Sequence, residues 1–152
     1  MQAQPIYTKL NWEHTHSKQL CYPTTTAAAL ALNIPTGAVS DTYGAWTLVI
    51  PASTYSLPFD IHFITVLDLP NVDNYIFQIG VGASQELSAT IPVEKAAAQA
   101  ANTSIPIITA KTDASWLGEH GKISPSDAVY VRVLRNGAGA VNTHIYLISH
   151  EY

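Results

Sequence analysis

An acid and two histidines lie almost side by side near the start of the sequence, in NWEHTHS at residues 11–17. Carboxylate and imidazole groups bind zinc, and His14 and His16, two residues apart, point the same way if the segment is extended. Zinc sites need several ligands held in place by supporting hydrogen bonds. Residues 11–17 lack the periodicity of a folded element. We therefore expect no metal here and interpret Glu13, His14 and His16 as part of a polar contact segment.

Hydrolysis by serine, histidine and aspartate is a second chemistry that these residue types allow. Asp60 and His62 share one face of the strand pattern FDIHFITV, where the carboxylate could orient the imidazole. The sequence has no GxSxG motif, and Cys21 is followed by Tyr22 and Pro23, unlike a protease nucleophile. We interpret Asp60 and His62 as a surface pair and predict that the protein is not an enzyme.

Two further patterns suggest ligand binding. GVGASQ at residues 80–85 begins like a dinucleotide-binding loop, but it lacks the third glycine and no helical pattern follows. We predict that these glycines close a strand with a turn, and we expect no cofactor. Tyr43, Tyr55 and Trp116 could stack on sugar rings as in a lectin, or could belong to the core or to an interface.

Composition narrows the function classes. The chain has 152 residues, the size of one domain, and a net charge of −4 with seven scattered Lys and Arg residues, so we expect no nucleic-acid partner. A single cysteine excludes an internal disulfide. No apolar leader or membrane-length run is found, which predicts a soluble chain made in the cytoplasm without a membrane partner. Only 12% of residues are charged, which is typical of a protein packed against copies of itself or a partner.

Period-two alternation between Pro, Gly, Asn and Asp residues predicts strands. The clearest candidates are residues 45–50, 61–68, 75–81, 128–135 and 141–149, and the weaker ones are 27–33, 87–92 and 105–110. The alanine-rich residues 93–102 are the one helical candidate, as a short helix or an ordered loop. About eight short strands without alternating helices predict an all-β sandwich with jelly-roll topology.

The last two strands are expected to form a hairpin. In VYVRVLR, Val129, Val131 and Val133 share one face, as in a sheet with one buried side. Asn136-Gly137 follows directly, and this dipeptide tolerates the positive φ of a tight turn. In the returning strand VNTHIYLIS, Ile145 and Leu147 share a face.

Residues 1–23 differ from the sandwich domain predicted over residues 24–152. They contain Tyr7, Trp12 and Tyr22 but no clean periodicity. Trp and Tyr are the side chains that often anchor a segment in a partner's pocket. We therefore predict an extended N-terminal arm that orders on contact with a partner.

Five segments together resemble a known family in their order of strands and turns: YGAWTLVIPAS (43–53), FDIHFITV (59–66), YIFQIGVGAS (75–84), SIPIITA (104–110) and AVYVRVLRNGAGAVNTHIYLIS (128–149). The pattern resembles small virion proteins of tailed bacteriophages, namely capsid decoration or cement proteins and neighbouring fibre components. This resemblance implies a β-sandwich, often trimeric, that binds the outer capsid face at junctions between major capsid protein subunits. It implies no catalytic residues.

We therefore expect a structural virion protein that decorates the capsid surface and stabilises the shell. Its expected partners are the major capsid protein and itself, as a homotrimer. The residues expected to contact the capsid or a neighbouring subunit are Tyr7, Trp12, His14, His16 and Tyr22. The alternative hypothesis is a head-fibre or tail adhesin that binds a host glycan through aromatic side chains such as Trp116.

Overall fold

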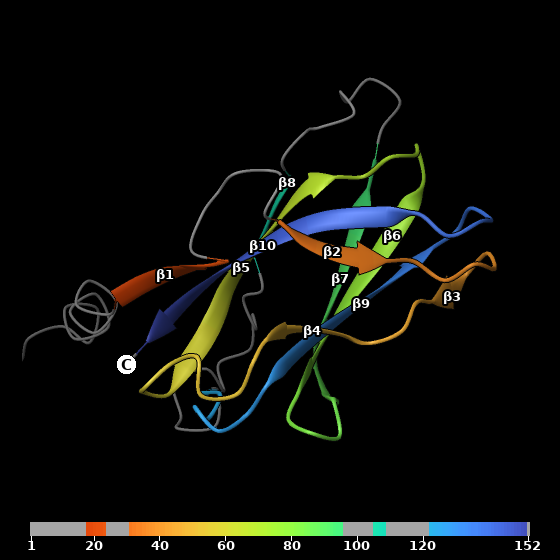
Figure 1. The fold of residues 1–152 in the computed structure, drawn as a ribbon. Helices are drawn as coiled ribbons and strands as arrows, with labels where there is room; N and C mark the ends of the chain where they lie inside the picture. Colours follow the sequence, from red (N-terminus) through yellow and green to blue (C-terminus); the bar gives the residue numbers. More distant parts are fainter. Residues whose placement is uncertain (1–17, 24–30, 96–104, 109–121, 152) are drawn as a thin grey trace, which may run out of the picture.

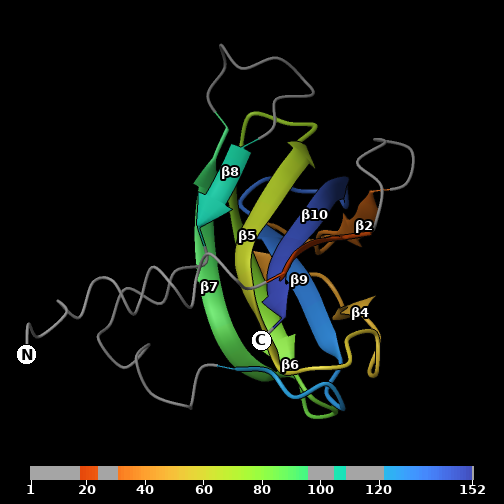
Figure 2. The same ribbon diagram turned by 90° about the vertical axis from the view of Figure 1, so that its left-hand side faces the viewer.

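Every regular element in the computed structural model is a β-strand, over the residues that it describes, 18–23, 31–95, 105–108 and 122–151. The strands form two antiparallel sheets that pack together (Figures 1 and 2). The predicted all-β sandwich is thus confirmed, while jelly-roll topology stays a prediction.

The first sheet is centred on the C-terminal strand β10 (Asn142–Glu151). One edge of β10 pairs with β5 (Phe59–Asp68), which in turn pairs with β8 (Ile105–Ile108). The other edge of β10 pairs with β1 (Lys18–Tyr22) at one end and with β2 (Leu32–Pro35) at the other. The structure describes residues 18–23 of the predicted arm, and β1 within them is a strand of this sheet.

The second sheet is built around β9 (Val129–Arg135). One edge of β9 pairs with β6 (Asn74–Val81), which pairs with β7 (Glu86–Glu94). Its other edge pairs with two short strands, β3 (Thr42–Tyr43) and β4 (Thr47–Ile50). Every strand predicted from periodicity therefore overlaps an observed strand, whereas β1 and β3 were not predicted. Residues 27–30 and 109–110 of two predicted strands lie outside the described ranges.

The predicted terminal hairpin is wrong, because β9 and β10 lie in different sheets. Residues 136–141 cross between the layers, and neither Asn136 nor Gly137 has the positive φ that a tight hairpin turn requires. The buried Arg135 side chain donates hydrogen bonds to the carbonyl oxygens of Gly137 and Ala138. These contacts hold the connection in a crossing path, and both edges of β9 are already paired.

Thr36 fixes the far end of the crossing. Its backbone N–H donates to the carbonyl oxygen of Val141 over 2.9 Å, and its Oγ1 accepts from the Val141 N–H over 3.0 Å. Thr36 also bridges to Val133 on β9. The segment after β2 therefore contacts both sheets where the chain passes from one to the other.

A true hairpin joins β6 to β7 through residues 82–85, as the glycines of GVGASQ predict. Gly82 has a φ of 76° and Gln85 a φ of 50°, and glycine adopts the first at no steric cost. The helical candidate at residues 93–102 is wrong at its start, because Val93 and Glu94 end β7, and residues 96–102 lie outside the described ranges.

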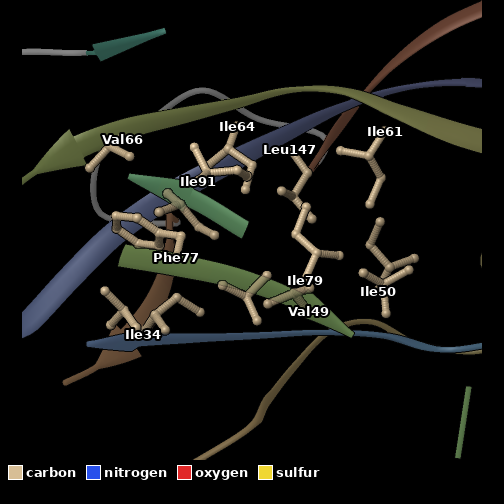
Figure 3. Close-up of a cluster of buried hydrophobic side chains, with 14 of the residues drawn as sticks. Ile34, Val49, Ile50, Ile61, Ile64, Val66, Phe77, Ile79, Ile91 and Leu147 are labelled. Carbon is tan, nitrogen blue, oxygen red and sulfur yellow. The ribbon is translucent and has the colours of Figure 1, made fainter. Parts of the chain in front are cut away.

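The core fills the space between the sheets, where side chains from both layers point toward one another (Figure 3). Val129, Val131 and Val133 are fully buried, as are Ile145 and Leu147 from the opposite layer. Burying each such side chain contributes about 1.5–3 kcal/mol. The predicted facing of both strands is therefore confirmed, although they meet across the core and not edge to edge.

Candidate functional site

Most of the predicted contact residues lie outside the described part of the chain. These are Tyr7, Trp12, His14 and His16, together with Glu13, and Trp116 lies outside it as well. Tyr22 ends β1 opposite Leu147 and packs, half-buried, against the hydrophobic core of its own chain.

The residues considered for hydrolysis lie on β5. Asp60 is buried, with 7% of its surface exposed, which corrects the expectation of a surface pair. The side chain of His62 lies outside the described part of the structure. Within the described ranges, no group of three His, Cys, Asp or Glu side chains could hold a metal ion.

Tyr55 belongs to the core and is not placed to stack on a sugar. Its hydroxyl lies 2.7 Å from the Oγ of the fully buried Ser149, and its ring centroid lies 4.5 Å from that of Phe59. Burial raises the pKa of Tyr55, and the hydrogen bond to Ser149 partly opposes the rise. Of the three aromatic residues considered for sugar binding, Tyr43 remains as a described surface residue.

Tyr43 lies on the outer face of the β3/β4/β9/β6/β7 sheet, where side chains follow three cross-strand rows. Alternation away from the buried valines directs Tyr130, Arg132 and Leu134 of β9 outward. The strand register places the neighbours of Tyr130 in a first row across β4, β9, β6 and β7, which consists of Leu48, Tyr130, Gly80 and Leu87. Leu48 is 48% exposed and Leu87 is 58% exposed, so this row presents an apolar surface.

The third row is also apolar. It consists of Tyr43, Leu134, Ile76 and Pro92, in register across β3, β9, β6 and β7. The middle row is polar and consists of Arg132, Gln78 and Thr90. We call these three rows, together with Trp46, the Arg132 face.

Trp46 lies across the Arg132 face from the segment between β3 and β4. A Cβ placed on Gly80 would come within 3.0 Å of Cη2 of Trp46, so the indole reaches over β9 to β6. A side chain at residue 80 would displace the ring. Gly80 thus leaves room for the indole to lie close to the sheet.

Arg132 is held in the middle of the face by three neighbours. Its Cζ lies 4.5 Å from the ring centroid of Tyr43 and 4.3 Å from that of Trp46, both within cation–π range. Its Nε donates to Oε1 of Gln78 over 2.8 Å, and Nε2 of Gln78 donates to Oγ1 of Thr90 over 3.4 Å. The guanidinium is therefore fixed before any partner arrives.

The composition of this face is unusual for a solvated sheet surface. Antiparallel sheets with one wet side alternate between apolar inward and polar outward residues. Here two of the three rows of the Arg132 face are apolar or aromatic and the third carries a single charge, while the next outward row, Asn74 and Glu94, is polar. Interfaces are enriched in Trp, Tyr and Arg, which also dominate binding energy. The Arg132 face therefore has the composition of a protein contact surface.

Sequence reasoning did not identify this face, although part of its signal is visible in the sequence. Tyr130 and Leu134 occupy the outward positions of VYVRVLR, so that strand has apolar side chains on both faces. On β6, Ile76 is likewise an apolar residue at an outward position. The place of Trp46 is different, because it depends on how the chain bends between β3 and β4.

No helix long and apolar enough to cross a membrane occurs in the described ranges. Comparison of the chain with protein-family models, curated proteins and solved structures finds no match.

Proposed function

We propose that this protein is a non-enzymatic structural protein of a tailed-phage virion, which binds the outer surface of the capsid and stabilises the shell. The observation that carries the proposal is the Arg132 face, an apolar and aromatic surface on the sheet side that faces away from the core. Its proposed partner is the major capsid protein, at the virion surface.

Stabilisation of a shell needs a rigid module that binds the assembled lattice. A ligand that binds one state preferentially adds its binding free energy to that state. Two packed sheets supply rigidity, and a preformed face loses little conformational entropy on binding. Copies joined as an oligomer, a homotrimer in our proposal, gain avidity at a lattice of repeated sites even when each contact is weak.

The adhesin alternative requires ring faces that are free to stack on a sugar. At the Arg132 face, the guanidinium of Arg132 lies over the rings of both Tyr43 and Trp46. This arrangement favours contact with a protein over sugar stacking. A glycan array discriminates between the two functions, because the decoration protein is expected to bind none of its sugars.

Immunogold labelling of intact phage particles that carry the protein tests the location. We expect a lattice of label over the head. Label confined to the fibres or the tail tip would support the adhesin, and particles without label would contradict a virion role altogether.

A matched pair of variants tests the surface. Leu87 on the Arg132 face and Val72 in the loop before β6 are equally exposed, at 58% each. Replacing Leu87 with Glu places a charge in the apolar face and is expected to weaken binding to capsids by about tenfold or more in a co-sedimentation assay. Val72→Glu should bind like the unchanged protein. Equal binding by both variants would show that the Arg132 face is not the contact surface.

A further inference from the structure

We infer that Arg132 is the anchor for a carboxylate, so that the partner protein presents an Asp or Glu side chain surrounded by apolar residues. This inference rests on the proposed function and specifies the chemistry of the same contact. Its basis is the contrast between a fixed guanidinium and the lack of an ion-paired carboxylate beside it in the part of the chain that the structure describes.

The neighbours of Arg132 occupy one edge and the flat face of the guanidinium. Nε, one of its five N–H donors, is bonded to Gln78, while the planar group lies over Tyr43 and Trp46. Among the described residues, the hydrogen bonds leave the N–H groups of the two terminal nitrogens for a ligand. Two parallel N–H donors match the two oxygens of a carboxylate.

No carboxylate forms an ion pair with Arg132 within residues 18–23, 31–95, 105–108 and 122–151. Arg135, three residues further along β9, has a carboxylate partner, because its Nε lies 3.4 Å from Oδ2 of Asp73. Arg132 is half-buried between apolar rows, so a partner surface that covered it without an anion would desolvate the charge at a cost. A carboxylate on the partner removes that cost.

A two-fold pairing of two copies through this face is disfavoured, although head-to-tail contacts in a homotrimer are not. In a two-fold face-to-face dimer, Arg132 at the centre of the face would approach Arg132 of the other copy. Like charges brought together at an interface disfavour that pairing. A nucleic acid is equally unsuited, since the three rows contain one positive charge. A different protein with a surface acid is the occupant that the charges favour.

The test measures binding of the full chain to purified capsids for the unchanged protein and for Arg132→Gln, Arg132→Lys and Lys122→Gln. Lys122→Gln removes the same charge at an exposed residue outside the Arg132 face. We expect Arg132→Gln to weaken binding about 30-fold or more, as for the loss of one member of a buried pair. Arg132→Lys should also weaken binding, since lysine lacks the planar fork. Lys122→Gln should bind normally.

A chemical readout identifies the group on the partner. Capsids whose surface carboxylates have been converted to neutral amides with a carbodiimide and an amine should bind the unchanged protein weakly. Arg132→Gln should bind amidated and untreated capsids equally. Thermal melting of each variant confirms that it is folded. A double variant that combines Arg132→Gln with Gln78→Ala shows whether the hydrogen bond from Arg132 to Gln78 contributes to binding.

The outcomes separate this inference from the proposed function. If the unchanged protein does not bind capsids, the proposed function fails. If it binds and Arg132→Gln or Arg132→Lys binds equally well, the carboxylate anchor is wrong while the capsid role stands. Binding that survives amidation of the capsid would also contradict the anchor.

Discussion

Arg132 and Arg135 show how differently one strand uses two arginines. Arg132 points outward, with its guanidinium over two aromatic rings. Arg135 is 3% exposed, and its side chain binds Asp73 and the carbonyl oxygens of the crossing that follows β9. The first is available to a partner, and the second organises the fold.

Buried tyrosines make a prediction at the residue scale. Burial raises the pKa of both Tyr55 and Tyr75 above the ordinary value of about 10. A raised pKa means that the folded protein holds the phenol proton more tightly than the unfolded chain does. The stability that this contributes is complete below pH 10 and is lost as the pH rises through the folded-state pKa.

We therefore expect the melting temperature to fall above about pH 10, measured by circular dichroism from pH 8 to pH 12. Tyr55→Phe removes one of the phenols with a raised pKa and should flatten this fall, although it lowers stability at pH 8 by about 1–3 kcal/mol because Ser149 loses its partner. An identical pH profile for Tyr55→Phe would show that Tyr55 does not contribute.

At the scale of elements, the crossing from β9 to β10 depends on a few polar contacts. Asp73 in the loop before β6 reaches the buried Arg135, and Oδ1 of Asn136 accepts from the N–H of Asn74 over 3.0 Å. These contacts join the start of β6 to the end of β9. They stabilise the crossing path where an Asn-Gly hairpin could otherwise have formed.

We predict that Asp73→Asn lowers the free energy of unfolding by about 2 kcal/mol, because it leaves the buried Arg135 cation without its carboxylate. Urea denaturation measures the loss. Asp41→Asn is the control, since Asp41 is exposed and its φ of 58° is one that asparagine tolerates. Equal stabilities for the two variants would refute the role of Asp73.

At the scale of the whole molecule, the two sheets have well-protected central strands. Both edges of β9 and of β10 are paired, and their inward side chains are fully buried at Val131 and Leu147. Backbone hydrogen bonds in such strands open only in large unfolding events. The short strands β3 and β4 share the remaining edge of β9 and have fewer pairing residues.

Amide hydrogen exchange followed by mass spectrometry should accordingly show the slowest exchange in β9 and β10, with faster exchange in β3 and β4. β9 belongs to one sheet and β10 to the other. If the layers open separately, the amides of β9 and β10 should lose protection at different concentrations of a mild denaturant. If the sandwich unfolds as one unit, they should lose protection together. Rapid exchange of β9 and β10 in native buffer would contradict the observed pairing.

Local patterns in the sequence determined which segments are strands and which of their faces are buried. Period-two alternation depends on neighbouring residues, so the valines of β9 and the apolar positions Ile145 and Leu147 of β10 could be assigned without knowledge of the fold. The turn at Gly82 was predictable for the same reason, since glycine is favoured where φ is positive.

Only the tertiary structure decided which strands pair and which surface is left for a partner. A hairpin and a crossing bury the same faces of β9 and β10, so their sequences alone do not distinguish the two, and the contacts of Arg135 and Thr36 come from distant segments. The Arg132 face likewise joins residues from β3, β9, β6 and β7 with Trp46. Strand formation depends on neighbours in sequence, whereas pairing and surfaces depend on residues far apart in the chain.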